Sequence, residues 1–81
     1  MWHVYILRCA DGTLYTGITT DIDRRANQHN SPDKGAKYTR VRRPVRVVYT
    51  SPFESRSAAS IEEARIKKLS RSEKLGLISG K

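Results

Sequence analysis

Two stretches near the start of the chain carry the alternating β-branched and aromatic residues that are typical of strands, at residues 2–9 and 13–18. Asp11 and Gly12 lie between them, and an Asp-Gly pair is a strong signal for the tight turn of a hairpin. A third strand is expected at residues 45–50, because Pro52 is expected to break it. The pattern therefore predicts a hairpin and one later strand.

Three further segments carry the signals of helices. A helix over residues 22–30 follows Asp21, which is a good N-cap residue. A second helix is expected at about residues 58–69, and a last short helix at about residues 71–78, which opens with capping-box spacing. Residues 31–44 are expected to form a long, basic, irregular loop, and loops of this length are usually functional or mobile.

The order of elements is β-β-α-β-α-α, which favours an α+β fold: a three-stranded antiparallel sheet flanked by helices on one or both faces. With 81 residues there is room for one hydrophobic core, so residues 1–81 are expected to form a single domain. The lone Cys9 cannot form an internal disulfide, which fits a reducing compartment. The first residues resemble neither a signal peptide nor a membrane span, so a cytoplasmic protein without membrane contact is expected.

The net charge of the chain is strongly positive. Sixteen Lys and Arg residues against eight Asp and Glu residues give +8 at pH 7. Residues 41–81 hold ten basic and four acidic groups, or +6 of this total. A small domain with this charge attracts polyanions through counterion release, which favours nucleic acid as a partner. A merely solubilising surface is the plainer alternative, and charge alone separates neither DNA from RNA nor an enzyme from a binding protein.

The hairpin carries the first candidate chemistry. Tyr5 and Tyr15 lie on its two strands, and a matching register would bring both rings to one face beside Gly17. A glycine in a strand allows close approach of a ligand to the backbone. Taken alone, such a tyrosine pair is more often a cross-strand packing pair than a catalytic one.

The following helix adds an arginine and a histidine. Arg25 and His29 are four residues apart, so they share one face of the helix. Arginine supplies a forked donor for phosphate oxygens, and histidine can titrate near neutral pH and act as a base or proton shuttle. Arg24 is a competing candidate, and spacing alone does not decide between the two arginines.

The second long helix carries two neighbouring carboxylates. Helical periodicity places Glu62 in the apolar stripe and Glu63 at its flank, where a carboxylate could hold a hard cation such as Mg²⁺. Salt bridges to Arg65 or Lys67 are the commoner fate of such groups. The stripe itself is expected to be formed by Ala58, Ile61, Ile66 and Leu69. The sequence contains no zinc-site spacing, phosphate loop or nucleotide fingerprint.

Together these motifs resemble the GIY-YIG nuclease superfamily, and in particular its small, stand-alone bacterial UPF0213 group. The resemblance covers residues 2–75, nearly the whole chain, and its parts are Val4-Tyr5-Ile6, Tyr15-Thr16-Gly17, Arg25, His29 and Glu63. It implies a catalytic site of Tyr5, Tyr15, Arg25, His29 and Glu63, with one Mg²⁺ or Mn²⁺ on Glu63. It selects Arg25 over Arg24, and Glu63 over Glu62. The sequence departs from the family pattern at His3, Thr16 and Ile18.

The function that the resemblance implies is metal-dependent endonuclease activity on DNA, in repair or recombination. Phosphates flanking the site would be bound by Gly17, Lys34, Lys37, Arg40, Arg42, Arg43, Lys67, Lys68 and Arg71. One alternative is a nucleic-acid-binding module of the same fold with weak or no turnover. Another is an interaction domain for an acidic protein, for which Trp2, Tyr49 and Phe53 are the only hint of an exposed apolar patch. An unknown protein partner could also supply specificity.

Overall fold

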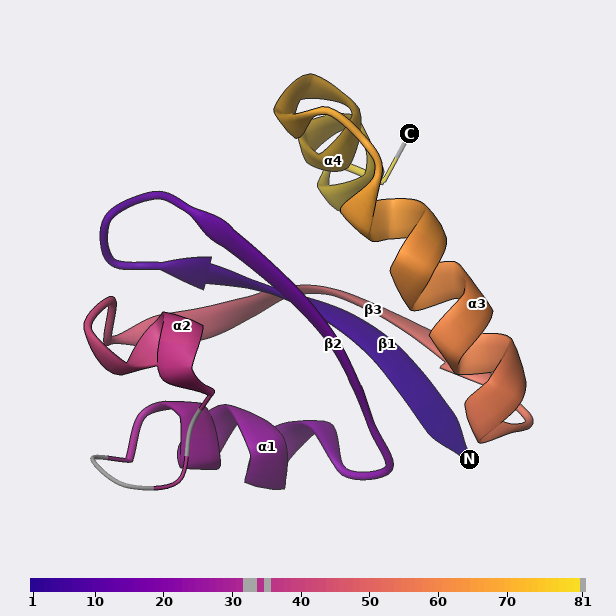
Figure 1. The fold of residues 1–81 in the computed structure, drawn as a ribbon, viewed down its shortest axis with the longest axis horizontal. Helices are drawn as coiled ribbons and strands as arrows, with labels where there is room; N and C mark the ends of the chain where they lie inside the picture. The colour runs from indigo at the N-terminus through magenta and orange to yellow at the C-terminus, as the bar shows by residue number, and fades with distance from the viewer. Residues whose placement is uncertain (32–33, 35, 81) are drawn as a thin grey trace.

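Three antiparallel strands form one sheet at the centre of the fold. The computed structural model describes residues 1–31, 34 and 36–80. Strand β1 spans Trp2–Cys9, β2 spans Leu14–Thr19 and β3 spans Val45–Phe53. Their order in the sheet is β2-β1-β3, so β1 is central and the other two strands are edges (Figure 1). The α+β class and the expected order of the main elements are confirmed.

The hairpin between β1 and β2 has the register that the site requires. Gly12 adopts a φ of +85°, a left-handed conformation that glycine tolerates without strain, so the turn closes at this residue. In the resulting register Tyr5 lies opposite Gly17, and Leu7 lies opposite Tyr15. Because side chains alternate along a strand, both tyrosines lie on one face of the sheet.

Three helices have the side-chain caps that their sequences indicate. Helix α1 spans Ile22–His29, α3 spans Arg56–Lys67 and α4 spans Arg71–Ile78. The side chains of Asp21, Ser55 and Ser70 accept hydrogen bonds from the first turns of these helices. Ser70 and Glu73 complete the predicted capping box in both directions.

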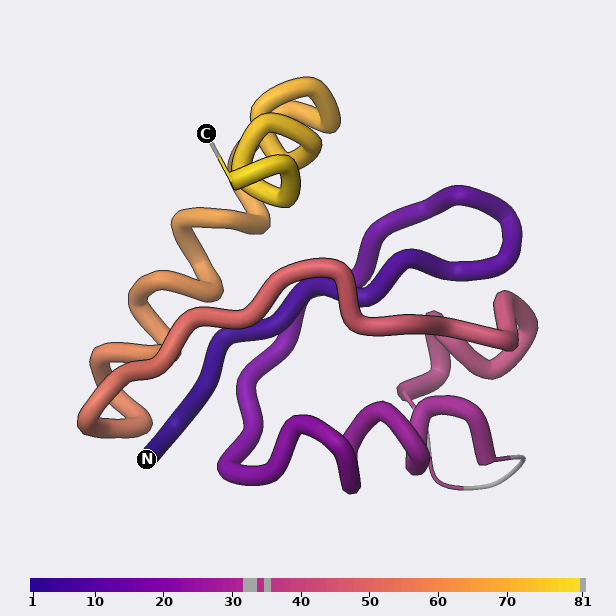
Figure 2. The backbone as a smooth tube through the Cα atoms, turned by 180° about the vertical axis from the view of Figure 1, so that it is seen from behind, coloured from indigo at the N-terminus to yellow at the C-terminus, as the bar shows by residue number. Residues whose placement is uncertain are grey.

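The sheet is covered on both faces, and the two faces bury different residues. On one face Val4 and Ile6 pack with Ala59 and Ile66 of α3. On the other face Tyr5, Leu7, Cys9 and Val45 form a second cluster, which Tyr15, Ile22 and Val47 border. Figures 1 and 2 show α1 and α3 on opposite sides of the sheet. The tyrosines therefore lie on the α1 face.

Strand β3 is longer than the sequence indicates. It continues through Pro52 to Phe53, so the expectation that Pro52 breaks the strand was wrong. Pro52 pairs with His3 of β1. Because β3 is an edge strand, one of its sides has no partner strand, and a missing N–H is tolerated there.

A short helix interrupts the stretch that was expected to be irregular from 31 to 44. Helix α2 spans Lys37–Arg40, while residues 32, 33 and 35 of this stretch lie outside the described part of the chain. The Ala36 carbonyl accepts hydrogen bonds from the N–H groups of Thr39 and Arg40, and this forms a single turn. Four residues are too few to leave a periodic signal in a sequence.

The inner face of α3 also differs from the predicted stripe. Ile61, expected on the inner side, is 70% exposed, and Ala59 is fully buried instead. The helix begins at Arg56, two residues earlier than expected, and its buried residues Ala59 and Ile66 are seven apart, which keeps them on one side. Helix α3 is therefore rotated about its axis relative to the orientation that its apolar residues predict, because the sheet contacts the side of Ala59 and not that of Ile61.

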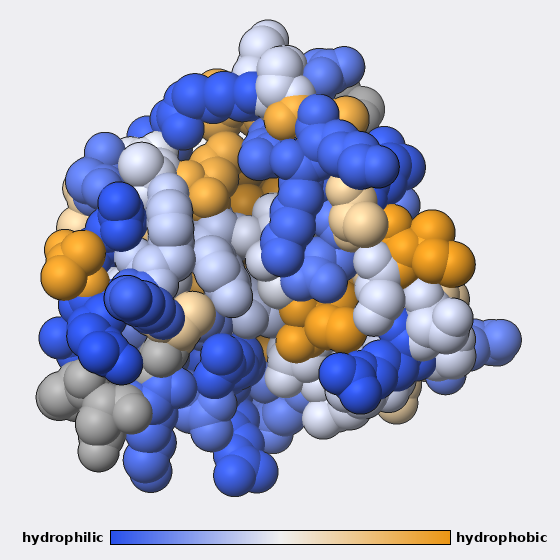
Figure 3. All heavy atoms as spheres, in the orientation of Figure 1, coloured by the Kyte–Doolittle hydropathy of each residue, from blue (hydrophilic) through white to orange (hydrophobic). Residues whose placement is uncertain are grey.

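The expected apolar patch is not exposed. Trp2, Tyr49 and Phe53 are partly buried and pack against the cluster on the α3 face. The surface in Figure 3 is largely hydrophilic, with hydrophobic side chains in separate small areas. Among the described residues, no helix is both long and apolar enough to cross a membrane.

Candidate active site

Tyr5 is the buried centre of the candidate site. Its side chain is only 3% exposed, and its hydroxyl lies 2.9 Å from Nε2 of His29. Burial raises the pKa of the Tyr5 hydroxyl to about 12; a hydrogen bond from Arg25 and, to a smaller extent, its positive charge oppose this rise, while the charges of Tyr15 and Glu63 add to it. Tyr5 is therefore a neutral phenol at pH 7.

Gly17 makes room for this phenol. A Cβ atom built on Gly17 would lie 2.5 Å from the Tyr5 hydroxyl oxygen and 2.7 Å from the adjoining ring carbon. Real Cβ atoms essentially never come this close to another heavy atom. The Tyr5 hydroxyl thus lies directly over the backbone of the edge strand β2, and a larger residue at position 17 would displace it.

His29 is fully buried in the last turn of α1. Its Nδ1 atom lies 2.9 Å from the hydroxyl oxygen of Thr39, so both ring nitrogens have a side-chain partner. Burial, together with the positive charge of Arg25, lowers the pKa of His29 to about 4. The imidazole is neutral at pH 7 and has no direct access to solvent.

Tyr15 completes an aromatic cluster with Tyr5 and His29. Its ring centroid lies 6.5 Å from that of Tyr5 and 5.1 Å from that of His29, which is within the range of favourable aromatic contact. Tyr15 also stacks on Tyr38 of α2, with the two ring centroids 5.8 Å apart. The guanidinium carbon of Arg42 lies 4.1 Å from the centroid of the Tyr38 ring.

Arg25, not Arg24, lies beside the buried phenol. Its guanidinium donates to Oε1 of Gln28 at 2.9 Å and to the Lys34 carbonyl at 3.3 Å. Its charge lowers the pKa values of both Tyr5 and His29. Arg25 lowers the pKa of Tyr5 more through a hydrogen bond with the phenol than through its charge alone.

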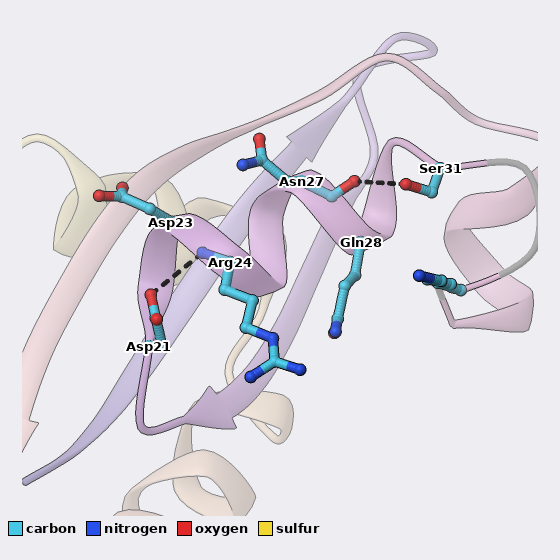
Figure 4. A pocket seen from close by; sticks show the side chains of 7 residues that line it. Asp21, Asp23, Arg24, Asn27, Gln28 and Ser31 are labelled. Carbon is cyan, nitrogen blue, oxygen red and sulfur yellow. Dashed lines mark hydrogen bonds between the residues drawn. The ribbon is translucent and has the colours of Figure 1, made fainter.

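Arg24 lines a hollow of about 580 Å³ at α1. Figure 4 shows the side chains of Asp21, Asp23, Asn27 and Gln28 around the same hollow. A smaller hollow of about 200 Å³ is lined by both arginines. Neither hollow is lined by Tyr5, Tyr15 or His29.

Glu63 belongs to α3, which packs on the face opposite the tyrosines. Its carboxylate lies 3.3 Å from Nζ of Lys67, and its side chain is 23% exposed. The Glu63 charge nevertheless contributes to the raised pKa of Tyr5, so the two groups lie within electrostatic range. Helix α3 contacts the edge strand β2, and a side chain on its flank can lie beside the free edge of that strand.

The two carboxylates of α3 differ in their partners. Glu62 holds the guanidinium of Arg65 through two hydrogen bonds of 2.7 and 2.6 Å, and this arginine lowers the pKa of Glu62. The side chains of Glu62 and Glu63 are 21% and 23% exposed, so burial does not separate the position expected for Glu62 from the one expected for Glu63. Glu63 has a single lysine contact of the kind that contributes at most about 1 kcal/mol, so its carboxylate is the one more easily released for a cation.

Glu63 can hold a divalent cation only as a single protein ligand, with water and substrate as the other ligands. Within the described residues no three His, Cys, Asp or Glu side chains lie together as a metal site. Mg²⁺ and similar hard cations are commonly held by one carboxylate together with water and substrate phosphates. The donor set of Glu63 alone fits that type of site and not a closed protein cage.

The predicted phosphate-binding residues fall into two groups. Lys34, Lys37 and Arg40 are exposed on the α1–α2 side, while a second exposed group near the junction of α3 and α4 consists of Lys67, Lys68 and Arg71. Arg42 and Arg43 are partly buried and engaged within the chain: Arg42 with Asp11 at 3.2 Å, and Arg43 with the Arg40 carbonyl at 3.0 Å. Their guanidinium groups are therefore less free to bind phosphate than predicted.

Two residues of α2 that contact the candidate site were given no role from the sequence. Thr39 is fully buried against His29, and Tyr38 stacks on Tyr15. Both lie in a stretch expected to be irregular, so no periodicity connected them to α1 or to the hairpin.

The chain belongs to the GIY-YIG family. The family model described as the GIY-YIG catalytic domain, a nuclease family, matches residues 1–75. The matched residues include all three strands and helices α1, α2 and α3.

Within that family the relatives are UPF0213 proteins. A UPF0213 protein of Desulfotalea psychrophila is 58% identical over 77 residues, which cover 95% of this chain and 70% of the relative. One from Halobacterium salinarum is 54% identical over 77 residues, covering 95% of this chain and 99% of the relative. The solution NMR structure of a UPF0213 protein from Bacillus halodurans superposes with a TM-score of 0.63 at 52% identity, covering all of this chain and 86% of the other.

Proposed function

We propose that this protein is a metal-dependent endonuclease that hydrolyses phosphodiester bonds in DNA, with a role in repair or recombination. The observation that carries the proposal is the buried 2.9 Å contact between the Tyr5 hydroxyl and His29 Nε2. A phenol and a neutral imidazole in direct contact, with an arginine beside them, are the groups needed to move a proton next to a phosphate. Membership of a nuclease family supports the same function.

In this proposal Tyr5 is the group that contacts the attacking water, and His29 acts through it. His29 is fully buried, so it reaches water through the phenol and not directly. The water transfers a proton to the Tyr5 oxygen while the Tyr5 proton moves to His29 Nε2. The water oxygen then forms the new bond to phosphorus, the bond to the leaving oxygen breaks, and that oxygen takes a proton from solvent. His29 returns its extra proton through the Tyr5 hydroxyl to solvent, which restores both neutral groups.

The two pKa values decide how this transfer proceeds. Burial raises the pKa of Tyr5 to about 12 and lowers that of His29 to about 4, so a neutral phenol and a neutral imidazole are the resting forms in the free protein at pH 7. The two proton movements are concerted, so that Tyr5 never carries a full negative charge.

Substrate binding makes His29 a better base. The charge of Arg25 is one of the two factors that lower the His29 pKa. A phosphate bound against Arg25 offsets that charge, so the pKa of His29 rises in the complex. Arg25 also donates to the phosphate as negative charge accumulates on its oxygens.

Glu63 is the proposed cation ligand. A divalent cation, when bound, neutralises charge on the scissile phosphate and stabilises the leaving oxygen. Glu63 would hold it from the flank of α3 after exchanging its contact with Lys67. Tyr15, in contact with both Tyr5 and His29, keeps the phenol and imidazole in place and lines the same face.

The basic side chains would hold the nucleic acid without reading its sequence. Lys34, Lys37 and Arg40 are exposed on the α1–α2 side, where α1 also carries Arg25. Each phosphate neutralised contributes about −0.9 to the slope of log K against log salt concentration. Three such contacts would give a slope of about −3.

Plasmid nicking by the purified protein tests the proposal. Supercoiled and branched DNA are incubated with wild type, Tyr5→Phe and Glu63→Gln, each with Mg²⁺, with Mn²⁺ and with a chelator. We expect cleavage by wild type with metal, and a loss of about 100-fold or more in both variants. Cleavage that is equal in wild type and both variants would exclude this site.

Matched substitutions separate the site from general damage. Tyr49→Phe removes a hydroxyl on the α3 face, and Glu62→Gln removes the carboxylate next to Glu63; both are expected to retain activity. For binding, Lys37→Ala with Arg40→Ala is compared with Arg8→Ala and Arg46→Ala, a cross-strand pair of the same total charge. Only the first pair is expected to reduce the salt slope by about 2.

A binding module without turnover is the second candidate. The low pKa of His29 and the high pKa of Tyr5 in the free protein favour it, because neither group is a base at rest near pH 7. It predicts salt-sensitive binding, no cleavage with either metal, and an affinity that Glu63→Gln leaves unchanged. Cleavage by wild type that Glu63→Gln abolishes would eliminate it.

A further inference from the structure

Helix α2 contributes to the candidate site at two points, through Tyr38 and Thr39. We infer that Thr39 is a positioning residue that fixes the tautomer of His29, so that the unprotonated nitrogen faces Tyr5. The kinetic consequence rests on the proposed function, but the tautomer itself does not.

The contacts form a continuous chain in the protein interior. The Thr39 side chain is fully buried, and its hydroxyl oxygen lies 3.0 Å from the Ala36 carbonyl oxygen and 2.9 Å from His29 Nδ1. On the other side of the ring, Nε2 lies 2.9 Å from the Tyr5 hydroxyl. All three distances are those of well-formed hydrogen bonds.

Counting protons along this chain gives one consistent assignment. A carbonyl oxygen only accepts, so the Thr39 hydroxyl donates to the Ala36 carbonyl and has only lone pairs left for His29. Nδ1 of His29 must then carry the ring proton and donate to Thr39. Because the imidazole is neutral, Nε2 has a lone pair and accepts from the Tyr5 hydroxyl.

One contact competes with this assignment. The Ala36 N–H points at His29 Nδ1 from 3.4 Å, and it would require a lone pair on that nitrogen. This distance is beyond the usual range for N–H donors, whereas the Thr39 contact is 0.5 Å shorter. Loss of the Thr39 hydroxyl would leave the Ala36 N–H as the partner of Nδ1 and would move the ring proton to Nε2.

The tautomer determines what Tyr5 can do. With the lone pair on Nε2, His29 can take the Tyr5 proton, and the phenol oxygen keeps its own lone pairs for water. With the proton on Nε2, His29 donates to Tyr5 and can no longer receive its proton. Thr39 thus acts on the reaction through His29, as the third group that orients a base.

Tyr38 anchors the helix that carries Thr39. An exposed tyrosine beside a nuclease site could stack on a nucleic-acid base, but this ring, which is 39% exposed, already has two side chains packed against it. Tyr15 is stacked on one face, and Arg42 contacts the ring at 4.1 Å. Arg42 also donates to the Tyr38 carbonyl at 2.7 Å and pairs with Asp11 at 3.2 Å. The contacts of Tyr38 and Arg42 with Tyr15 and Asp11 together hold α2 against the hairpin.

Nitrogen NMR of the histidine ring tests the tautomer without any need for activity. In ¹⁵N-labelled wild type at pH 7 we expect the His29 Nδ1 resonance of a protonated nitrogen and the Nε2 resonance of an unprotonated one. Thr39→Ser keeps the hydroxyl and should keep this pattern. Thr39→Val removes it and should move the proton towards Nε2.

Kinetics of cleavage test the consequence. Thr39→Val is expected to lower kcat by about 10- to 100-fold with little change in KM, and Thr39→Ser is expected to restore most of the rate. Thr16→Val is the matched control, because Thr16 is a buried threonine on the opposite face and forms no hydrogen bond through its side chain within the described residues.

The outcomes separate the two proposals. A wild-type His29 with its proton on Nε2 would overturn the inference, even if Thr39→Val fails to fold. So would an unchanged tautomer in a folded Thr39→Val, or a kcat that falls equally in Thr39→Ser and Thr39→Val. If wild type has the expected tautomer but cleaves no DNA, the positioning role stands and the nuclease proposal fails.

Discussion

Mild acid should destabilise this protein through His29. The imidazole is fully buried and neutral, and its pKa falls from 6.5 to about 4 on folding. The unfolded chain therefore binds a proton below pH 6.5 that the folded protein does not bind until about pH 4. The contribution of neutral His29 to the free energy of unfolding is therefore present above pH 6.5 and is lost as the pH falls from 6.5 to about 4.

The magnitude follows from the difference between the two pKa values. A depression of about 2.5 units corresponds to about 3 kcal/mol once the pH is below 4, and about 2 kcal/mol of this is lost between pH 7.5 and 5.0. That is a large share of the 5–15 kcal/mol that small domains typically have. The pKa values of Asp11, Glu62 and Glu73 are lowered from 3.8, 4.5 and 4.5, so the stability that these carboxylates contribute is lost mainly below pH 5.0. The change between pH 7.5 and 5.0 therefore reports on His29.

Urea unfolding at pH 7.5 and 5.0, followed by circular dichroism, measures the loss. His29→Gln is the reference, because it keeps a polar side chain without the titration, and it also retains His3. Wild type should lose about 2 kcal/mol more than the variant between the two pH values. An equal loss in both proteins, or a His29 that titrates near pH 6.5 by NMR, would refute the reasoning.

Three further substitutions have effects that the contacts determine. Gly17→Ala places a methyl group 2.5 Å from the Tyr5 hydroxyl and should cost about 1–3 kcal/mol in urea unfolding, whereas Gly76→Ala, with nothing within 4 Å, should not destabilise the protein. Asn30→Ala removes two hydrogen bonds, of 3.0 and 2.7 Å, to the first residue of β3, and should lower the free energy of unfolding by about 2–3 kcal/mol. Ser70→Ala removes the capping box of α4 and should cost about 1 kcal/mol, with a change below half of that contradicting the cap's role.

Local signals in the sequence were sufficient for most of the fold. The hairpin followed from the Asp11-Gly12 turn, and the last helix from the capping box of Ser70, because both depend on residues that are neighbours in the chain. Pro52 within β3 and the exposed Ile61 of α3 could not be predicted in this way. Their environments depend on which strand lies at the sheet's edge and how α3 rotates on it, and both are set by tertiary packing.

The same distinction holds for the candidate site. Tyr5 and Tyr15 share a face because of a hairpin register, and Arg25 lies beside His29 because of helical spacing, so their proximity was predictable. Thr39 reaches His29 from ten residues further along a stretch without periodicity. That contact exists only because α2 packs back onto the sheet, and nothing local encodes it.

The polar character of this core cluster is not explained by stability. A domain of this size has few buried positions, and the Tyr5 hydroxyl, the His29 ring and the Thr39 hydroxyl fill three of them. Burying each polar group requires a compensating partner, and apolar residues of similar volume would avoid this requirement and the sensitivity to acid as well. Their arrangement does have a chemical use, because it places a neutral imidazole in contact with a phenol whose oxygen can accept a proton, beside Arg25. Local costs of this kind are concentrated at functional sites, which is why the Tyr5–His29–Thr39 chain is the part of the molecule that we connect to catalysis.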